Sequence, residues 1–211
     1  MAKKIKYAGK RVLLAIFNFF YPVKVLGKKN LPDGGALIVS NHFSAIDPAI
    51  MHRVYYKDIY FLAKKEIYEK KIWHGILNRL GAIPIDRENV DLPSMMKAIR
   101  TLKEGHKLVV YPEGTRNKTG SNEIQEVKAG AVLFSIKAKK PIVPVIAYKK
   151  SKLFRRTYLY VGEPFEFSEF YDKKLTGQDY KELDVVLKEK MVEARKTLID
   201  LVENGNNRSK K

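Results

Sequence analysis

Short runs of consecutive apolar residues alternate along residues 35–148 with longer segments in which apolar residues recur at helical spacing. Short runs of β-branched and aromatic residues are typical of buried strands, and the helical period is typical of amphipathic helices. Strands are therefore expected at 35–41, 58–63, 82–86, 107–113 and 142–148, and helices at 46–56, 65–80, 92–104 and 128–138.

The strands in this alternation are apolar throughout, rather than at every second position. Strands of this kind are buried on both faces, and in mostly parallel sheets they are connected through helices. The pattern predicts an α/β fold with a mostly parallel central sheet flanked by helices. Ligands of such sheets bind beyond the carboxyl ends of the strands, so candidate chemistry is expected there.

The C-terminal third adds a strand or hairpin arm at 154–167 and a closing helix at 178–203. The tail 204–211 has no apolar residue and is predicted to be disordered. Because the chain has 211 residues, 45% of them hydrophobic, and neither a repeat nor a linker, we expect one domain over 23–203.

Residues 1–22 form a separate segment with its own pattern. A helical projection places Ile5, Val12, Leu13, Ile16, Phe19 and Phe20 on one face and Lys3, Lys4, Lys10, Arg11 and Asn18 opposite, with Leu14 and Tyr7 outside the pattern. The longest nearly uncharged stretch, 12–23, is about half of a membrane span, and no small-x-small cleavage site follows it. Two interpretations stay open: an amphipathic helix in the membrane interface, and a terminal helix packed on the core.

The charge of the chain narrows its partners. The chain has 41 Lys and Arg residues and 23 Asp and Glu residues, so its net charge is +18. A charge of this size predicts anionic partners. Nucleic acid, an acidic membrane surface, phosphorylated metabolites and an acidic carrier protein all fit this charge. The absence of cysteine excludes disulfides, thiolate metal sites and a cysteine nucleophile.

The first candidate motif lies at the end of the strand expected at 35–41. His42 is followed five residues later by Asp47, which precedes Pro48. A histidine with a nearby carboxylate suits a general base held in one tautomer, and an aspartate before proline is also a good helix N-cap. We expect Asp47 to do both. Ser44 is not in a Gly-x-Ser-x-Gly turn, which disfavours a hydrolase triad.

The second motif, 111–120, follows the strand expected at 107–113. Gly114 allows backbone to approach a ligand closely, and Arg116 offers a planar fork for phosphate oxygens. Glu113 is expected to order this loop, and Thr115 lies between the glycine and the arginine. The loop lacks the Walker pattern but is predicted to bind phosphate.

Three further cations are candidates for the same ligand. Lys64 and Arg87 each follow an apolar run, and Lys128 is expected to open the helix at 128–138. A solvated surface charge is the alternative for each. The histidines other than His42 show no metal-ligand spacing, so no metal site is predicted.

Four segments, taken in order, resemble the sequence blocks of the glycerolipid acyltransferase family. They read NHFSAID (41–47), GAIPIDR (81–87), YPEGTRN (111–117) and IVPV (142–145). The His-x4-Asp and Pro-Glu-Gly-Thr-Arg strings are the specific parts, and the match is most similar to the bacterial 1-acyl-glycerol-3-phosphate acyltransferases. The chain departs from the family at Tyr111, where phenylalanine is common, at Pro84 and at Asn117.

The resemblance implies transfer of a fatty acyl group from a thioester to the 2-hydroxyl of lysophosphatidic acid, giving phosphatidic acid. It implies that His42 is the general base and that Asp47 orients it. Glu113, Gly114 and Arg116 would help to hold the acceptor, and Lys64 and Arg87 would meet its phosphate. With a thiolate as leaving group, this chemistry needs neither a metal nor a cofactor.

The donor stays open between acyl carrier protein and acyl-CoA. The expected partners are the donor, lysophosphatidic acid and an anionic membrane surface, on the cytoplasmic face of the cell membrane. Acylation of glycerol 3-phosphate or of another lysolipid is the alternative within this chemistry. A nucleic-acid-binding module is the alternative outside it, disfavoured because the aromatic residues fall in apolar runs.

Overall fold

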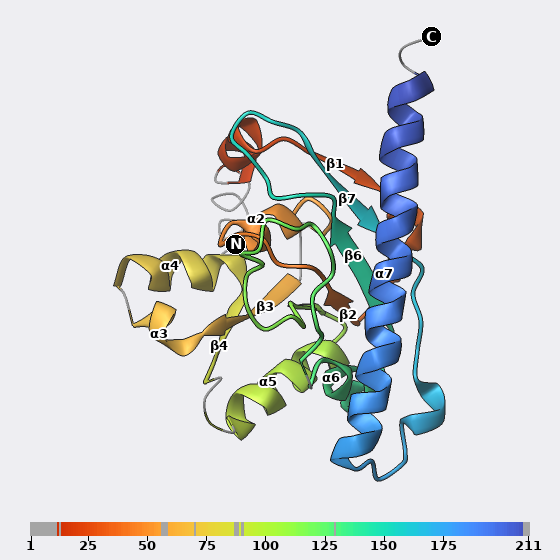
Figure 1. The fold of residues 1–211 in the computed structure, drawn as a ribbon. Helices are drawn as coiled ribbons and strands as arrows, with labels where there is room; N and C mark the ends of the chain where they lie inside the picture. The colour runs from red at the N-terminus through yellow and green to blue at the C-terminus, as the bar shows by residue number, and fades with distance from the viewer. Residues whose placement is uncertain are drawn as a thin grey trace.

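A single seven-stranded sheet organises the part of the chain that the computed structural model describes, namely residues 12, 14–55, 59–69, 71–86, 89, 91–128 and 130–208 (Figure 1). The strands are β1 (Val23–Leu26), β2 (Ala36–Val39), β3 (Ile59–Lys64), β4 (Ala82–Ile85), β5 (Lys107–Val110), β6 (Ile142–Ala147) and β7 (Thr157–Val161). Their order is β1-β7-β6-β2-β5-β3-β4, and every neighbouring pair is parallel except β6 and β7. The expected fold class is confirmed.

The central strand β2 shows why its sequence is apolar at every position. Leu37 and Val39 belong to the core on one face of the sheet, whereas Ala36 and Ile38 belong to the core on the other face. All four side chains are buried. Because both faces are covered, neither set of alternating side chains meets water.

Helices cover both faces of the sheet. Helices α5, α6 and α7 contribute to the core that contains Leu37, and α7 runs along that side of the molecule (Figure 1). Helix α2 contributes Ile50 and Met51 to the opposite core. The helices are α2 (Asp47–Met51), α3 (Lys65–Tyr68), α4 (Lys71–Leu80), α5 (Leu92–Lys103), α6 (Ala131–Ala138) and α7 (Gly177–Arg208).

Several boundaries differ from those expected. The helix expected at 46–56 ends at Met51, because the amides of residues 52–54 bond three residues back and tighten the chain into turns. The helix expected at 65–80 is divided into α3 and α4, and β1 was not expected. The strand within 154–167 is confirmed as β7, which pairs antiparallel with β6.

Residues 204–208, which belong to the predicted disordered tail, continue α7 to Arg208 in the structure. Once a helix is formed, each further residue adds a hydrogen bond, and no proline interrupts this segment. Residues 209–211 lie outside the described part of the chain.

The described part of the N-terminal segment is helical at residues 12 and 14–20. Leu14, which lay outside the predicted apolar face, is the residue that is buried, and Phe17 packs against the core around Ile38. Val12, Ile16 and Phe19 point to solvent. The predictions for residues 1–11 and 13 fall outside the described residues. Among the described helices, none has both the length and the apolar character to cross a bilayer.

Candidate active site

The two motifs meet at one edge of the sheet. β2 and β5 are parallel neighbours with Val39 opposite Val110, so the segments that follow them leave from the same edge. The N–H of Asn117 donates to the carbonyl of His42 at 2.7 Å. This bond ties the loop after β5 directly to the histidine, as the parallel sheet predicts.

His42 and Asp47 form a hydrogen-bonded pair. Nδ1 of His42 lies 2.8 Å from Oδ2 of Asp47. The histidine side chain is 17% exposed and the aspartate side chain is 9% exposed, so the imidazole is reachable while its partner is covered. The carboxylate accepts from Nδ1–H, which leaves the lone pair of the neutral ring on Nε2.

The prediction that Asp47 caps its helix is wrong. Oδ2 accepts from the backbone N–H groups of Phe43 at 2.7 Å and Ser44 at 2.8 Å, which precede the aspartate. Helix α2 has no side-chain cap, and the amides of Ala49 and Ile50 bond to the carbonyl of Ile46. The carboxylate thus holds the loop that carries His42, because the chain folds back over it.

Glu113 lies beneath the histidine loop and is 2% exposed. Its Oε2 accepts from the N–H of His42 and its Oε1 from the N–H of Gln125, both at 3.4 Å. Burial raises the pKa of the Glu113 carboxyl, and the two backbone donors oppose that shift. Glu113 therefore joins two segments that flank the loop 111–120, one of which carries His42.

Gly114 and Lys128 lie against each other. Gly114 has φ 71°, a left-handed conformation that favours glycine, and a Cβ added there would lie 2.7 Å from Cδ of Lys128. The N–H of Lys128 donates to the carbonyl of Pro112 at 2.8 Å. Lys128 does not open a helix as expected, because Gly130 takes φ 120° and α6 begins at Ala131.

The other predicted ligand-binding residues are Thr115, Arg116, Lys64 and Arg87. Thr115 and Arg116 are exposed on the loop that follows Gly114. Lys64 ends β3, which pairs with β5, and its Nζ lies 2.9 Å from Oε1 of Glu66. Arg87 falls outside the described residues.

Two residues that we did not predict complete the site. The ring of Tyr111 stacks on the imidazole of His42, with centroids 4.1 Å apart. Asn41 exchanges two hydrogen bonds with Ala147: Nδ2–H donates to the carbonyl at 2.9 Å, and Oδ1 accepts from the N–H at 2.8 Å. The sequence signal for Asn41 was an asparagine at the end of an apolar strand, where a polar side chain needs hydrogen-bond partners.

The site holds the parts of a proton-transfer centre. Among the described residues, no group of three or more His, Cys, Asp and Glu is placed to hold a metal ion. The arrangement supplies a reachable base in a fixed tautomer, a covered carboxylate behind it, and exposed cations on the adjoining loop.

A model of the family described as Acyltransferase matches residues 22–148, which include both motifs. The chain belongs to the acyltransferase family. The 1-acyl-sn-glycerol-3-phosphate acyltransferase of Bacillus subtilis (strain 168) is 34% identical over 155 residues, 70% of this chain and 76% of that protein. The protein of that name from Borreliella burgdorferi is 25% identical over 162 residues, 74% of this chain and 64% of that protein.

The fold of this acyltransferase is also similar to a solved one. The crystal structure of the 1-acyl-sn-glycerophosphate (LPA) acyltransferase PlsC from Thermotoga maritima superposes with a TM-score of 0.68 at 22% identity. The match covers 94% of this chain and 78% of that one. It therefore supports the fold over nearly the whole chain.

Proposed function

We propose that this acyltransferase moves a fatty acyl group from a thioester to the 2-hydroxyl of 1-acylglycerol 3-phosphate, giving phosphatidic acid. The observation that carries the proposal is the 2.8 Å pair of His42 and Asp47, set beside the Glu113–Gly114 turn at the carboxyl edge of the sheet. The names of the relatives from Bacillus subtilis and Borreliella burgdorferi support the same acceptor.

His42 acts as the general base through Nε2, because Asp47 occupies Nδ1. Nε2 takes the proton of the acceptor hydroxyl as its oxygen attacks the thioester carbonyl carbon. The carbon–oxygen bond forms and the carbon–sulfur bond breaks. The departing thiolate takes the proton from the His42 imidazolium and leaves as the thiol. Asp47 stabilises the intermediate imidazolium without taking its proton.

The loop after β5 binds the acceptor phosphate in this proposal. Arg116 offers two parallel N–H donors to phosphate oxygens, and Lys128 adds a charge beside Gly114. Thr115 supplies a hydroxyl, and Lys64 adds positive charge at the end of β3. Arg87 is expected to add a further positive charge. Binding the phosphate at a fixed distance from His42 brings the 2-hydroxyl to Nε2.

The donor is an acyl thioester of acyl carrier protein or of CoA, and the enzyme uses no cofactor or metal. Both donors are acidic, and a net charge of +18 attracts either. The enzyme is expected at the cytoplasmic face of the cell membrane, where residues 1–22 contribute a docking helix.

The test is an acyl-transfer assay with the purified full-length chain. Each donor is combined with 1-acylglycerol 3-phosphate, glycerol 3-phosphate and a neutral lysolipid, and His42→Ala is the control for contaminating enzyme. We expect phosphatidic acid from the first acceptor only, and only with His42 present. Equal transfer to glycerol 3-phosphate would contradict the acceptor, and full activity of His42→Ala would contradict the mechanism.

A further inference from the structure

The loop 149–156 exposes two large apolar side chains between cations. It connects β6 to β7, and Leu153 and Phe154 at its tip are 51% and 60% exposed. The residues around them are Lys149, Lys150, Lys152, Arg155 and Arg156, all exposed. The loop therefore exposes apolar side chains and positive charges side by side.

Phe154 is held at the surface in an unfavourable conformation. Its φ of 55° is left-handed, which is rare for a bulky side chain. Its N–H donates to the carbonyl of Phe20 at 2.7 Å, and the N–H of Arg155 donates to the carbonyl of Lys152 at 3.1 Å. The fold maintains this strain without burying the ring, which points to a role outside the core.

Phe154 joins the N-terminal helix in one apolar surface. Its ring centroid lies 6.0 Å from that of Phe19 and 5.4 Å from that of Phe20. Six exposed side chains make up this surface, which we call the docking patch: Val12, Ile16, Phe19, Phe20, Leu153 and Phe154. A contiguous exposed apolar patch ringed by polar residues marks an interaction site.

The positive charge around the docking patch indicates which kind of partner it binds. The sequence has no Asp or Glu in residues 1–32 or 148–162, the two segments that supply the patch. Apolar side chains on segments whose charged residues are all cations fit a surface with negative headgroups over a hydrocarbon interior. An anionic bilayer matches both properties.

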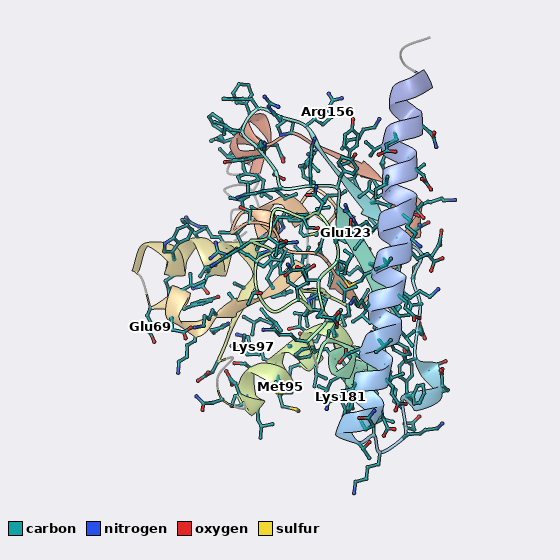
Figure 2. All side chains as sticks on the ribbon, in the orientation of Figure 1. Glu69, Met95, Lys97, Glu123, Arg156 and Lys181 are labelled. Atoms are coloured by element: carbon teal, nitrogen blue, oxygen red, sulfur yellow. The ribbon has the colours of Figure 1, made fainter. Side chains whose placement is uncertain are left out.

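The docking patch lies at the catalytic edge of the sheet. Asn41, which precedes His42, is bonded to Ala147, and the loop starts two residues later. Figure 1 shows the loop and the helix of residues 14–20 at one end of the molecule. In Figure 2, Arg156 extends from that end, and Met95, Lys97 and Lys181 lie at the other. Docking through the patch would bring the edge that carries His42 toward the lipid.

We propose that the loop 149–156 is a second membrane contact, which forms one docking surface for an anionic bilayer together with the exposed side chains of residues 12 and 14–20. The inference rests on the proposed function, which places the acceptor in a membrane, and it adds a contact that the N-terminal helix alone does not supply. Phe154 and Leu153 enter the interface, and Arg155 and Arg156 meet the headgroups.

The experiment measures binding of the full-length chain to vesicles of phosphatidylglycerol and phosphatidylcholine, with pure phosphatidylcholine for comparison. Leu153→Ser/Phe154→Ser and Arg155→Glu/Arg156→Glu are each expected to weaken binding to anionic vesicles about tenfold or more. The matched controls are Leu92→Ser/Met96→Ser, which are 62% and 61% exposed on α5, and Lys173→Glu/Lys174→Glu. Both controls are expected to bind as the unmodified chain does.

A second variant separates lost binding from lost folding. Phe154→Gly removes the ring but suits a positive φ, so it is expected to keep the thermal midpoint while binding anionic vesicles more weakly. The assay contains no substrate, so its result does not depend on which acceptor is acylated.

Three results would overturn the inference. The first is unchanged vesicle binding by a folded loop variant, and the second is equally tight binding to pure phosphatidylcholine. The third is a loop variant that keeps vesicle binding but loses binding to purified acyl carrier protein, which would make the loop a protein-binding surface.

Discussion

The ring of Tyr111 lies nearly parallel to the imidazole of His42, with the planes 22° apart and the centroids 4.1 Å apart. Its hydroxyl oxygen is buried and has no hydrogen-bond partner among the described residues. Burial raises the pKa of the Tyr111 hydroxyl well above its usual value, so the ring stays neutral. The ring therefore supports the base, while the hydroxyl adds a desolvation cost.

Replacing Tyr111 separates these two contributions. Tyr111→Phe is expected to keep kcat and to raise the free energy of unfolding, because an unpaired buried hydroxyl costs about 1–3 kcal/mol. Tyr111→Leu is expected to lower kcat about two- to tenfold, because it removes a stacked ring pair. Urea unfolding and steady-state rates check both. A large loss of kcat in Tyr111→Phe would instead give the hydroxyl a role in the reaction.

Substitutions at His42 should affect mainly kcat, whereas substitutions at Asp47 should affect both kcat and stability. His42→Ala is expected to lower kcat by about 10²–10⁴ with little loss of stability, because it removes a general base from an accessible position. Asp47→Asn keeps an oxygen for the N–H groups of Phe43 and Ser44, and is expected to lower kcat less.

Asp47→Ala is expected to lower the free energy of unfolding by about 1–3 kcal/mol more than Asp47→Asn, because two backbone donors lose their acceptor. Urea unfolding of the two variants measures the difference. Equal stability would show that the carboxylate holds only the imidazole.

Arg116 should govern the acceptor rather than the donor. Arg116→Ala is expected to raise the acceptor KM about 10- to 100-fold, because it removes a charge-assisted pair to the phosphate. Arg116→Lys restores the charge without the planar fork, so it is expected to recover only part of the loss. Rates at varied concentrations of each substrate test this. A raised donor KM with an unchanged acceptor KM would assign the loop to the thioester.

The sequence was sufficient for the sheet and the motifs because both depend on local patterns. A strand buried on both faces is apolar at every position, as in β2, and the parallel arrangement brings the segments after β2 and β5 to one edge. The meeting of His42 with the Pro-Glu-Gly-Thr-Arg loop followed from that arrangement.

The errors concern backbone geometry that residue types do not determine. Asp47 has the residue type and proline neighbour of an N-cap, yet its carboxylate turns back to residues 43 and 44, because the loop approaches it from that side. Likewise, Leu14 lay outside the predicted apolar face but is buried, whereas Phe19 and Phe20 meet a loop far along the chain. Such contacts appear only when distant segments are placed together.

The left-handed backbone of Gly114, rather than its contact with Lys128, should determine the cost of replacing this glycine. Gly114→Ala is expected to lower the free energy of unfolding by about 1–2 kcal/mol, because alanine disfavours a left-handed conformation. Lys128 is a flexible side chain that can move from the added methyl group, so Gly114→Ala should cost the same in a Lys128→Ala background. The four proteins of this cycle are compared in urea. Rescue by Lys128→Ala would make the contact with Cδ the cause.

The start of α6 is held by a carboxylate from another helix. Oδ2 of Asp184, in α7, accepts from the N–H of Gly130 at 3.4 Å, and Oδ1 is buried without a hydrogen-bond partner among the described residues. Burial raises the pKa of the Asp184 carboxyl to about 6. Asp179 lies in the first turn of the same helix, where the N–H of Thr176 lowers the pKa of its exposed carboxyl.

These opposite shifts predict opposite effects of pH. The raised pKa of Asp184 means that the folded state binds more protons than the unfolded state between about pH 4 and pH 6, so its charge lowers stability above that window. Asp184→Asn is therefore expected to gain stability relative to the unmodified chain at pH 7 and to lose that gain toward pH 4. Asp179→Asn, the matched control, should be less stable than the unmodified chain at pH 7 and should keep most of that deficit at pH 4, because the stability that a lowered pKa supplies is lost only as the pH falls below about 4. Urea unfolding at both pH values measures the two differences, and the same sign for both variants would show that burial of Asp184 does not control its charge.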